Sequence, residues 1–312
     1  MNSFYKNEIM KRYENNSYYS FEDNEYSTSY RDKGVLKINN NNIYDASSLY
    51  PNFTEILETC TDYSQKDFFR FLEELSEKIY KNSIRFVLIG AGGSVTNLLY
   101  WFREFQLFAN RFMEKNKTYS TTYKHYFLFN RILCIFEDDD IELSNLIRIP
   151  FDYKSLFSKV EIDKICLNKG VLLSEAISKT TGYKQLDCIK SKLDIGRAKT
   201  IIRNDLYSKH MFIGAPDIET RQSFNEKKIP LYTILHGSDS KNKQIGFICK
   251  NPTQEDLLQI ESYGKIDMKY YFYLQFLTAI EFIKYLHENI ENIATYEGHK
   301  KIWEKTVGDN EE

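Results

Sequence analysis

The hydrophobic positions alternate between short apolar runs and longer stretches with helical periodicity. Residues 85–89 and 132–136 are apolar runs of strand length, whereas residues 65–80 and 95–108 repeat their hydrophobic positions at helical spacing. A long apolar helix is expected at residues 267–291. Strands that alternate with helices favour a mostly parallel sheet covered on both faces. The sequence therefore predicts an α/β fold.

Further elements follow the same alternation in the second half of the chain. The pattern predicts a third strand at 184–190, a helix at 196–207, a fourth strand at 211–214, and a hairpin formed by 230–236 and 244–249. No internal repeat is visible. One α/β domain is therefore expected to account for most of the chain.

Three other segments differ in character from this domain. Residues 1–80 are expected to form an N-terminal extension, with a small hairpin at 35–44 and the amphipathic helix at 65–80, although disorder of residues 1–30 is an equally open interpretation. The main domain is assigned to residues 81–292, with an inserted polar and aromatic stretch at about 108–131. Residues 293–312 are expected to be a loose polar tail.

Composition excludes several classes of function. The 312 residues carry a net charge of -2 and a pI near 6.3, without a polybasic block, so neither nucleic acid nor an anionic membrane surface is an expected partner. No apolar run reaches the length of a membrane span and the first residues lack the apolar core of a signal peptide, which favours a cytoplasmic location. The five cysteines include no Cys-X-X-Cys pair, so no zinc site is expected.

The apolar run that ends at residue 89 is followed by Gly90, Gly92 and Gly93. Glycines at the end of a buried strand allow a phosphate to approach the amides of the next helix, where the helix dipole favours negative charge. Glu137 directly follows the second strand, where a carboxylate would accept hydrogen bonds from a ribose. Such a turn can also require glycine for purely steric reasons, so the glycines alone are weak evidence for a nucleotide site.

A longer motif follows Glu137. The sequence Ile-Glu-Leu-Ser-Asn-Leu-Ile-Arg at 141–148, preceded by Glu-Asp-Asp at 137–139, resembles the signature of the ThiF-type, ubiquitin-activating-enzyme-like adenylyltransferases. The resemblance covers about residues 84–289 and implies a Rossmann-like fold. It also implies an ATP-dependent reaction, with Mg²⁺, in which the C-terminal carboxylate of a small ubiquitin-like protein or peptide becomes an acyl-adenylate.

The resemblance assigns roles to particular residues. Gly90, Gly92 and Gly93 would lie under the nucleotide, Glu137 on the ribose, Asn145, Arg148 and Lys169 on the phosphates, and Asp217 on the magnesium ion, with assistance from Asp139. Lys164 is the alternative to Lys169 as the lysine that binds the phosphates. Each residue also has a structural interpretation: Asn145 could cap a turn, and Arg148 could pair with the local acids.

Departures from the family pattern leave other functions open. Val95 stands where the family usually has a further glycine, Glu137 replaces an aspartate, and Ile149 replaces a frequent glutamine. A non-catalytic binding or scaffold subunit is therefore the alternative, followed by an oxidoreductase or methyltransferase that uses the same glycine turn. Thioester transfer is not expected, because Cys249 is the only cysteine after Asp217.

The resemblance further implies a dimer in which a neighbouring subunit lends an arginine to the site. Arg12 and Arg31 are weak candidates for that arginine. The histidines at 125, 210 and 236 and Cys134 fall in no motif.

Overall fold

The computed structural model describes residues 53–140, 168–181, 186–238, 244–250, 255, 268–292 and 300–305. The hairpin expected at 35–44 and the motif at 141–148 lie outside these residues, as do Arg12, Arg31 and Lys164. Within the described residues, no helix combines the length and apolar character needed to cross a membrane.

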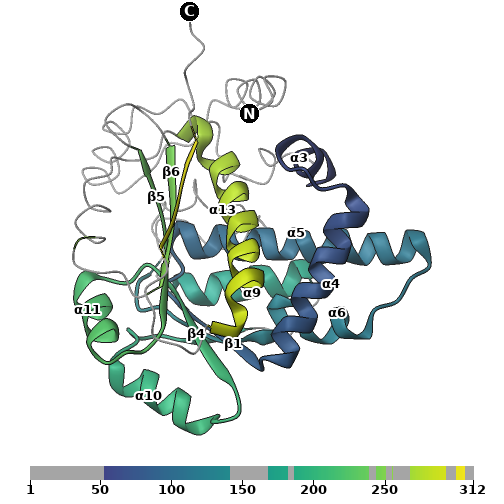
Figure 1. Ribbon diagram of the computed structural model, residues 1–312. Helices are drawn as coiled ribbons and strands as arrows, with labels where there is room; N and C mark the ends of the chain where they lie inside the picture. Colours follow the sequence, from purple (N-terminus) through teal and green to yellow (C-terminus); the bar gives the residue numbers. More distant parts are fainter. Residues whose placement is uncertain are drawn as a thin grey trace, which may run out of the picture.

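The described strands form one sheet, seen nearly edge-on in Figure 1. In chain order they are β1 (Ile84–Ile89), β2 (Ile132–Phe136), β3 (Asp187–Ile189), β4 (Lys209–Gly214), β5 (Leu231–Ser238), β6 (Gln244–Lys250) and β7 (Lys300–Lys305). Their order across the sheet is β3-β2-β1-β4-β5-β6-β7, in which β1 to β5 are parallel while β6 and β7 are antiparallel. The predicted mostly parallel α/β fold is confirmed.

Alternate residues of β1 pack into two different hydrophobic clusters. Phe86 and Leu88 belong to the larger cluster, and Val87 and Ile89 belong to the smaller one. Side chains alternate between the two faces of a strand, so both faces of the sheet are covered. This explains why β1 reads as a continuous apolar run and not as an alternating one.

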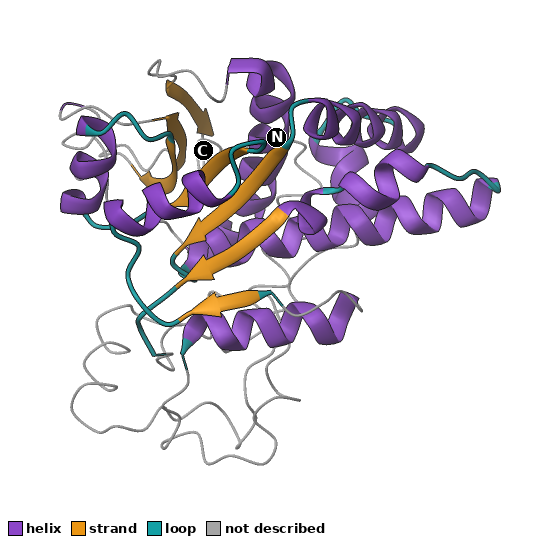
Figure 2. Cartoon of the chain, turned by 90° about the horizontal axis from the view of Figure 1, so that it is seen from below, coloured by secondary structure: helices purple, strands orange, loops and turns teal. Residues whose placement is uncertain are grey.

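Two groups of helices cover the two faces of the sheet, and Figure 2 shows helices on both sides of it. The larger cluster contains residues of α4 (Gln65–Lys81), α5 (Gly93–Asn116), α9 (Lys169–Thr181) and α13 (Met268–Asn289). The smaller cluster contains residues of α10 (Ile195–Asn204) and α11 (Ile218–Glu226). The predicted helices at 65–80, 196–207 and 267–291 are confirmed, with ends shifted by up to three residues, and α4 belongs to the same hydrophobic core as the sheet.

The helix predicted at 95–108 is much longer in the structure. It continues to Asn116, so α5 projects beyond the sheet (Figure 1). The polar stretch predicted as an insertion at 108–131 includes the end of α5, the short helix α6 (Thr121–Tyr126) and the 3₁₀ turn η4 (Leu128–Arg131). Aromatic residues of α5 and α6 pack on α4: Phe69 lies 4.7 Å from Phe112 and 6.1 Å from Tyr123 between ring centroids. The aromatic residues of this stretch therefore extend the core.

Besides α6 and η4, two further described elements lie where no helix or strand was predicted. Helix α3 (Phe53–Cys60) precedes α4, and β7 pairs with β6 in the segment expected to be a loose polar tail. The expectation of a tail without structure is wrong for Lys300–Lys305, because an edge strand needs only main-chain pairing along one side and tolerates lysines. The predicted hairpin at 230–249 is confirmed by the antiparallel pairing of β5 with β6.

Candidate functional site

The glycine turn joins the carboxyl end of β1 to the start of α5. Gly90 has a φ of +80°, which requires glycine, and its amide donates to the carbonyl of Phe136 at 2.8 Å. Gly92 is the N-cap of α5 with a φ of −71°, and no side chain caps the helix there. A Cβ added at Gly92 would meet no described atom within 4 Å. Backbone strain therefore explains Gly90 but not Gly92, beside which the described residues leave open space.

Val95, the departure that could have crowded this turn, lies in the first turn of α5. Its side chain is 5% exposed and belongs to the larger hydrophobic cluster. Val95 is thus a core residue in this structure. Gly93, the third glycine of the motif, is the first residue of α5.

Glu137 lies where the sequence places it, beside the glycine turn, but its carboxylate already has partners. The residue is 5% exposed, Oε2 accepts a hydrogen bond from the amide of Ala91 at 2.5 Å, and Oε1 accepts one from the amide of Asp139 at 3.0 Å. A carboxylate can accept about four hydrogen bonds. Two donors hold Glu137 in place and leave part of its acceptor capacity unused by these amides.

The acidic residues after β2 form a compact group with a cation beside it. One carboxylate oxygen from each of Glu137, Asp138 and Asp139 lies within 4.8 Å of the others. Lys169, the first residue of α9, pairs its Nζ with Oδ2 of Asp139 at 2.9 Å. Lys169 thus lies at the start of a helix and beside Asp139, and the roles of both residues toward ATP stay predictions. Hard oxygen donors of this kind suit Mg²⁺.

Asn168 is a residue that the sequence reasoning missed. It is 4% exposed, and its side-chain amide donates to the main-chain carbonyls of Glu137 at 2.8 Å and Asp139 at 3.3 Å. It immediately precedes α9 and accepts amide hydrogen bonds from the first turn. An asparagine just before a helical pattern is an N-cap signal, and that signal could have identified it.

Asp217 follows β4 and is the N-cap of α11, as the resemblance requires of a strand-end aspartate. Its Oδ1 accepts the amide of Thr220 at 2.8 Å, and Oδ2 lies 3.8 Å from Nζ of Lys192. The hydrogen bond from the Thr220 amide lowers the pKa of Asp217, with smaller contributions from Lys192 and Arg221 and against the effect of partial burial. Asp217 is therefore ionised at neutral pH. Arg221 lies in α11, the helix that follows Asp217.

The sheet topology brings these segments to one edge. Strand β1 lies between β2 and β4 in parallel pairing, so the glycine turn, Glu137 and Asp217 all follow the carboxyl ends of neighbouring strands. Ligands of open α/β sheets bind at this edge, where the connections from neighbouring strands diverge. Asn145 and Arg148 lie outside the described residues, so their places in the site stay predictions.

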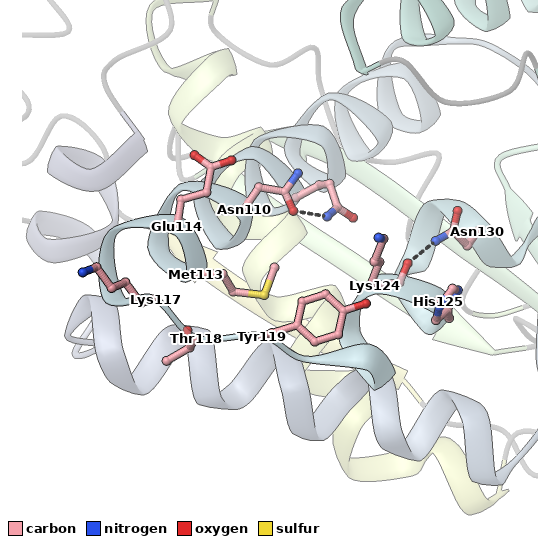
Figure 3. A pocket seen from close by; sticks show the side chains of 10 residues that line it. Asn110, Met113, Glu114, Lys117, Thr118, Tyr119, Lys124, His125 and Asn130 are labelled. Carbon is pink, nitrogen blue, oxygen red and sulfur yellow. Dashed lines mark hydrogen bonds between the residues drawn. The ribbon is translucent and has the colours of Figure 1, made fainter.

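A separate cavity lies at the opposite end of α5 (Figure 3). It has a volume of about 640 Å³ and is lined by residues of α5, α6 and the loop between them, among them Asn110, Tyr119 and His125. None of the described residues that the sequence assigns to the nucleotide lines it. It is distinct from the site at the sheet edge.

Comparison with known proteins gives weak likenesses. The chain matches no protein-family model and no curated protein. Solved structures that are similar to it include E. coli MccB together with MccA, at 14% identity over 83% of this chain and 84% of that chain, with a TM-score of 0.38. E. coli MccB alone matches at 12% identity over 84% and 83%, with a TM-score of 0.39, and PaaA at 13% over 88% and 89%, with a TM-score of 0.36.

E. coli MccB is a ThiF/E1-like adenylyltransferase, the class that the motif at 141–148 resembles.

Proposed function

We propose that the chain is an ATP-dependent adenylyltransferase that activates the C-terminal carboxylate of a small ubiquitin-like or peptide partner as an acyl-adenylate. One observation supports the proposal: the glycine turn, the Glu137–Asp139 segment and Lys169 meet at the carboxyl ends of β1 and β2. In the sequence, the motif at 141–148 that resembles the adenylyltransferases follows the Glu137–Asp139 segment. A glycine turn alone would suit many nucleotide-binding proteins. The acids, the lysine and the motif together favour phosphate chemistry.

The residues fit a bound nucleotide. The first amides of α5 point toward the helix N-terminus, where the N-cap residue Gly92 has no side chain to bond them and no described atom would lie within 4 Å of a Cβ at Gly92. Lys169 supplies a cation within reach of the acidic segment. In the proposed site Gly90, Gly92 and Gly93 lie under the nucleotide, and Glu137 faces the ribose.

Adenylation requires positioning more than covalent help. The partner's carboxylate oxygen attacks the α-phosphorus of ATP, the bond from that phosphorus to the bridging oxygen breaks, and pyrophosphate leaves. In the proposal, Asn145, Arg148 and Lys169 neutralise charge that moves onto the leaving group. Asp217, with Asp139, would hold Mg²⁺, which supplies further positive charge when bound.

Exchange of labelled pyrophosphate into ATP, dependent on a partner protein or peptide with a free C-terminus, tests this function. Exchange is expected with the partner and not with the same partner amidated at its C-terminus. A verified binding partner that supports no exchange would contradict catalysis. A homodimer or heterodimer is also proposed, and light scattering that shows only monomer at all concentrations would contradict it.

A non-catalytic nucleotide-free scaffold subunit is the second candidate. Its support is that both oxygens of Glu137 already accept hydrogen bonds from the chain, which is sufficient to explain a buried acid at this position. The melting temperature separates the two functions. Adding ATP and Mg²⁺ should raise the melting temperature of an enzyme, whereas it should not change that of the scaffold.

A further inference from the structure

Among the described residues of the candidate site, Asn168 has the side chain with the most hydrogen bonds. Its Nδ2 donates to the carbonyls of Glu137 and Asp139, at 2.8 and 3.3 Å. Its Oδ1 accepts from the amides of Gly170 and Val171, at 3.1 and 3.2 Å. One carboxamide therefore joins the acidic segment after β2 to the first turn of α9.

The backbone around Asn168 reinforces this junction. Asn168 forms an antiparallel bridge with Asp140, and the amide of Lys169 donates to the carbonyl of Asp139 at 3.1 Å. The ion pair between Lys169 and Asp139 lies directly beside these main-chain bonds. The position of the lysine is thus set by the same few residues that hold the acids.

Gly170 shows how closely α9 approaches the strands. A Cβ at this position would lie 2.6 Å from Sγ of Cys188, 3.0 Å from Cβ of Glu137 and 3.2 Å from Oδ1 of Asn168. Cys188 itself donates its thiol to Oδ1 of Asn168 at 3.3 Å. The first turn of α9 therefore packs directly on the ends of β2 and β3, and only glycine fits there without a shift.

We propose that Asn168 is a positioning residue: its carboxamide fixes Lys169 and the Glu137–Asp139 segment in one arrangement, so that the ammonium group is held at the nucleotide side of the sheet edge. This inference rests on the proposed function. Its physical basis is that a charge contributes most to a phosphoryl-transfer step when the protein holds it in place beforehand. Asn168 acts through Lys169 and needs no contact with the substrate.

A simple helix cap is the competing explanation, and Asn168→Ser separates the two. Serine keeps an oxygen that can accept from the first turn of α9, and it is as good an N-cap as asparagine. It lacks the amide group that reaches the carbonyls of Glu137 and Asp139. The substitution therefore retains the cap and removes the junction.

The first measurement does not depend on activity. Lys169 is labelled with an amine-reactive reagent in the full chain without nucleotide, and its rate is compared with that of Lys81, which pairs with Glu77 on α4. Asn168→Ser should raise the relative labelling rate of Lys169 by about 2- to 5-fold, the range expected when a partly exposed ion pair is lost. An unchanged rate would overturn the inference, whatever the protein's activity.

The second measurement is a double-mutant cycle on pyrophosphate exchange. Asn168→Ser should lower the rate by up to about 10²-fold, as expected for a misplaced catalytic group, but should have little further effect in protein that already carries Lys169→Ala. If Asn168→Ser lowered the exchange rate by the same factor in the wild-type protein and in Lys169→Ala, the result would contradict action through Lys169. Ser64→Asn, the reverse exchange at the N-cap of α4, is the matched control for capping.

Gly170→Ala is a second way to move Lys169 out of its position. The added methyl group should push the first turn of α9 away from Cys188 and raise the labelling of Lys169, and Cys188→Ala should reverse part of that rise. Labelling that stays at the wild-type rate in Gly170→Ala would count against the inference. If the wild-type protein neither binds ATP nor supports exchange, the proposed function fails, and the labelling results alone decide the role of Asn168.

Discussion

The carboxylate of Glu137 accepts a hydrogen bond from the main-chain amide of Ala91, with 2.5 Å between Oε2 and N. These residues follow two neighbouring parallel strands, β2 and β1, so the bond ties the acidic segment to the glycine turn. The other oxygen of Glu137, Oε1, accepts a hydrogen bond from the amide of Asp139. The same side chain that the sequence assigns to a ribose therefore also shapes the loop in which a ribose would bind.

Replacing Glu137 with glutamine should destabilise the protein. The side-chain amide of glutamine must face either the Ala91 or the Asp139 amide, so a buried donor loses its acceptor. We expect the free energy of unfolding in urea to fall by about 1–3 kcal/mol. Asp138→Asn, at the exposed neighbouring carboxylate, is the control and should change stability little. Wild-type stability of Glu137→Gln would show that Glu137 does not hold this loop.

Alanine should destabilise the protein more at Gly90 than at Gly92. Gly90→Ala forces a side chain into a φ of +80° and should cost about 1–2 kcal/mol of stability. Gly92→Ala meets ordinary backbone geometry and open space, so its effect on stability should stay below about 1 kcal/mol, the typical range for an N-cap change.

Nucleotide binding should separate the two variants further. The methyl group at Gly92 would occupy the space beside the amides of α5, so Gly92→Ala should weaken ATP binding in calorimetry more than its small change in stability explains. Unchanged ATP affinity in Gly92→Ala would place the nucleotide elsewhere or exclude it.

The strands and the helices of the sheet could be predicted because both faces of the sheet are buried. Continuous apolar runs such as β1 arise when alternate residues enter different clusters, and the helices that cover them keep a clear periodicity. Helix α5 is longer than predicted because residues 110–116 are mostly polar and exposed, and only Phe112 and Met113 among them pack against the core. Strand β7 could not be predicted because its lysines are typical of a solvated edge.

The site was predictable in position and less so in its connections. Gly90, Glu137, Lys169 and Asp217 lie at the element ends where the sequence places them. The hydrogen bond between Ala91 and Glu137 joins residues 46 positions apart, and the bond between Asn168 and Glu137 joins residues 31 positions apart. Local sequence pattern contains no signal for such contacts. The roles of Asn145 and Arg148 stay predictions.

Acidification should destabilise the protein through His210. Burial lowers the pKa of His210, with Arg85 acting in the same direction and Asp205 against it, and neither ring nitrogen has a hydrogen-bond partner among the described residues. A lowered histidine pKa means that the unfolded chain takes up protons first. The stabilising effect is therefore complete above the unfolded pKa of 6.5 and is lost as the pH falls below it toward the folded pKa.

Urea unfolding between about pH 7.5 and pH 5.5 measures this effect. The free energy of unfolding should decrease toward pH 5.5, and the decrease should be smaller in His210→Gln. His287 contributes with the same sign, because burial and the nearby Lys78 lower its pKa, so His287→Gln should also flatten the curve. A pH dependence that is identical in both variants and the wild-type protein would contradict the assignment.

Asp217 and Arg148 distinguish a catalytic site from a structural one. Asp217→Asn keeps an oxygen for the Thr220 amide, and asparagine caps helices as well as aspartate does, so the melting temperature should hardly change. If Asp217 places a magnesium ion, pyrophosphate exchange should nevertheless fall by about 10² to 10³. Asp194→Asn, the same exchange at the N-cap of α10, is the matched control and should retain the wild-type rate.

Arg148→Ala should lose activity in the same way, in rate more than in nucleotide affinity. Asp217→Ala should lose both the rate and about 1 kcal/mol of stability, because alanine cannot cap α11. The structural alternative gives the reverse pattern. Lowered stability in Asp217→Ala and in Arg148→Ala, with wild-type exchange rates in all three variants, would show that these residues only anchor their loops and that the adenylation chemistry resides elsewhere.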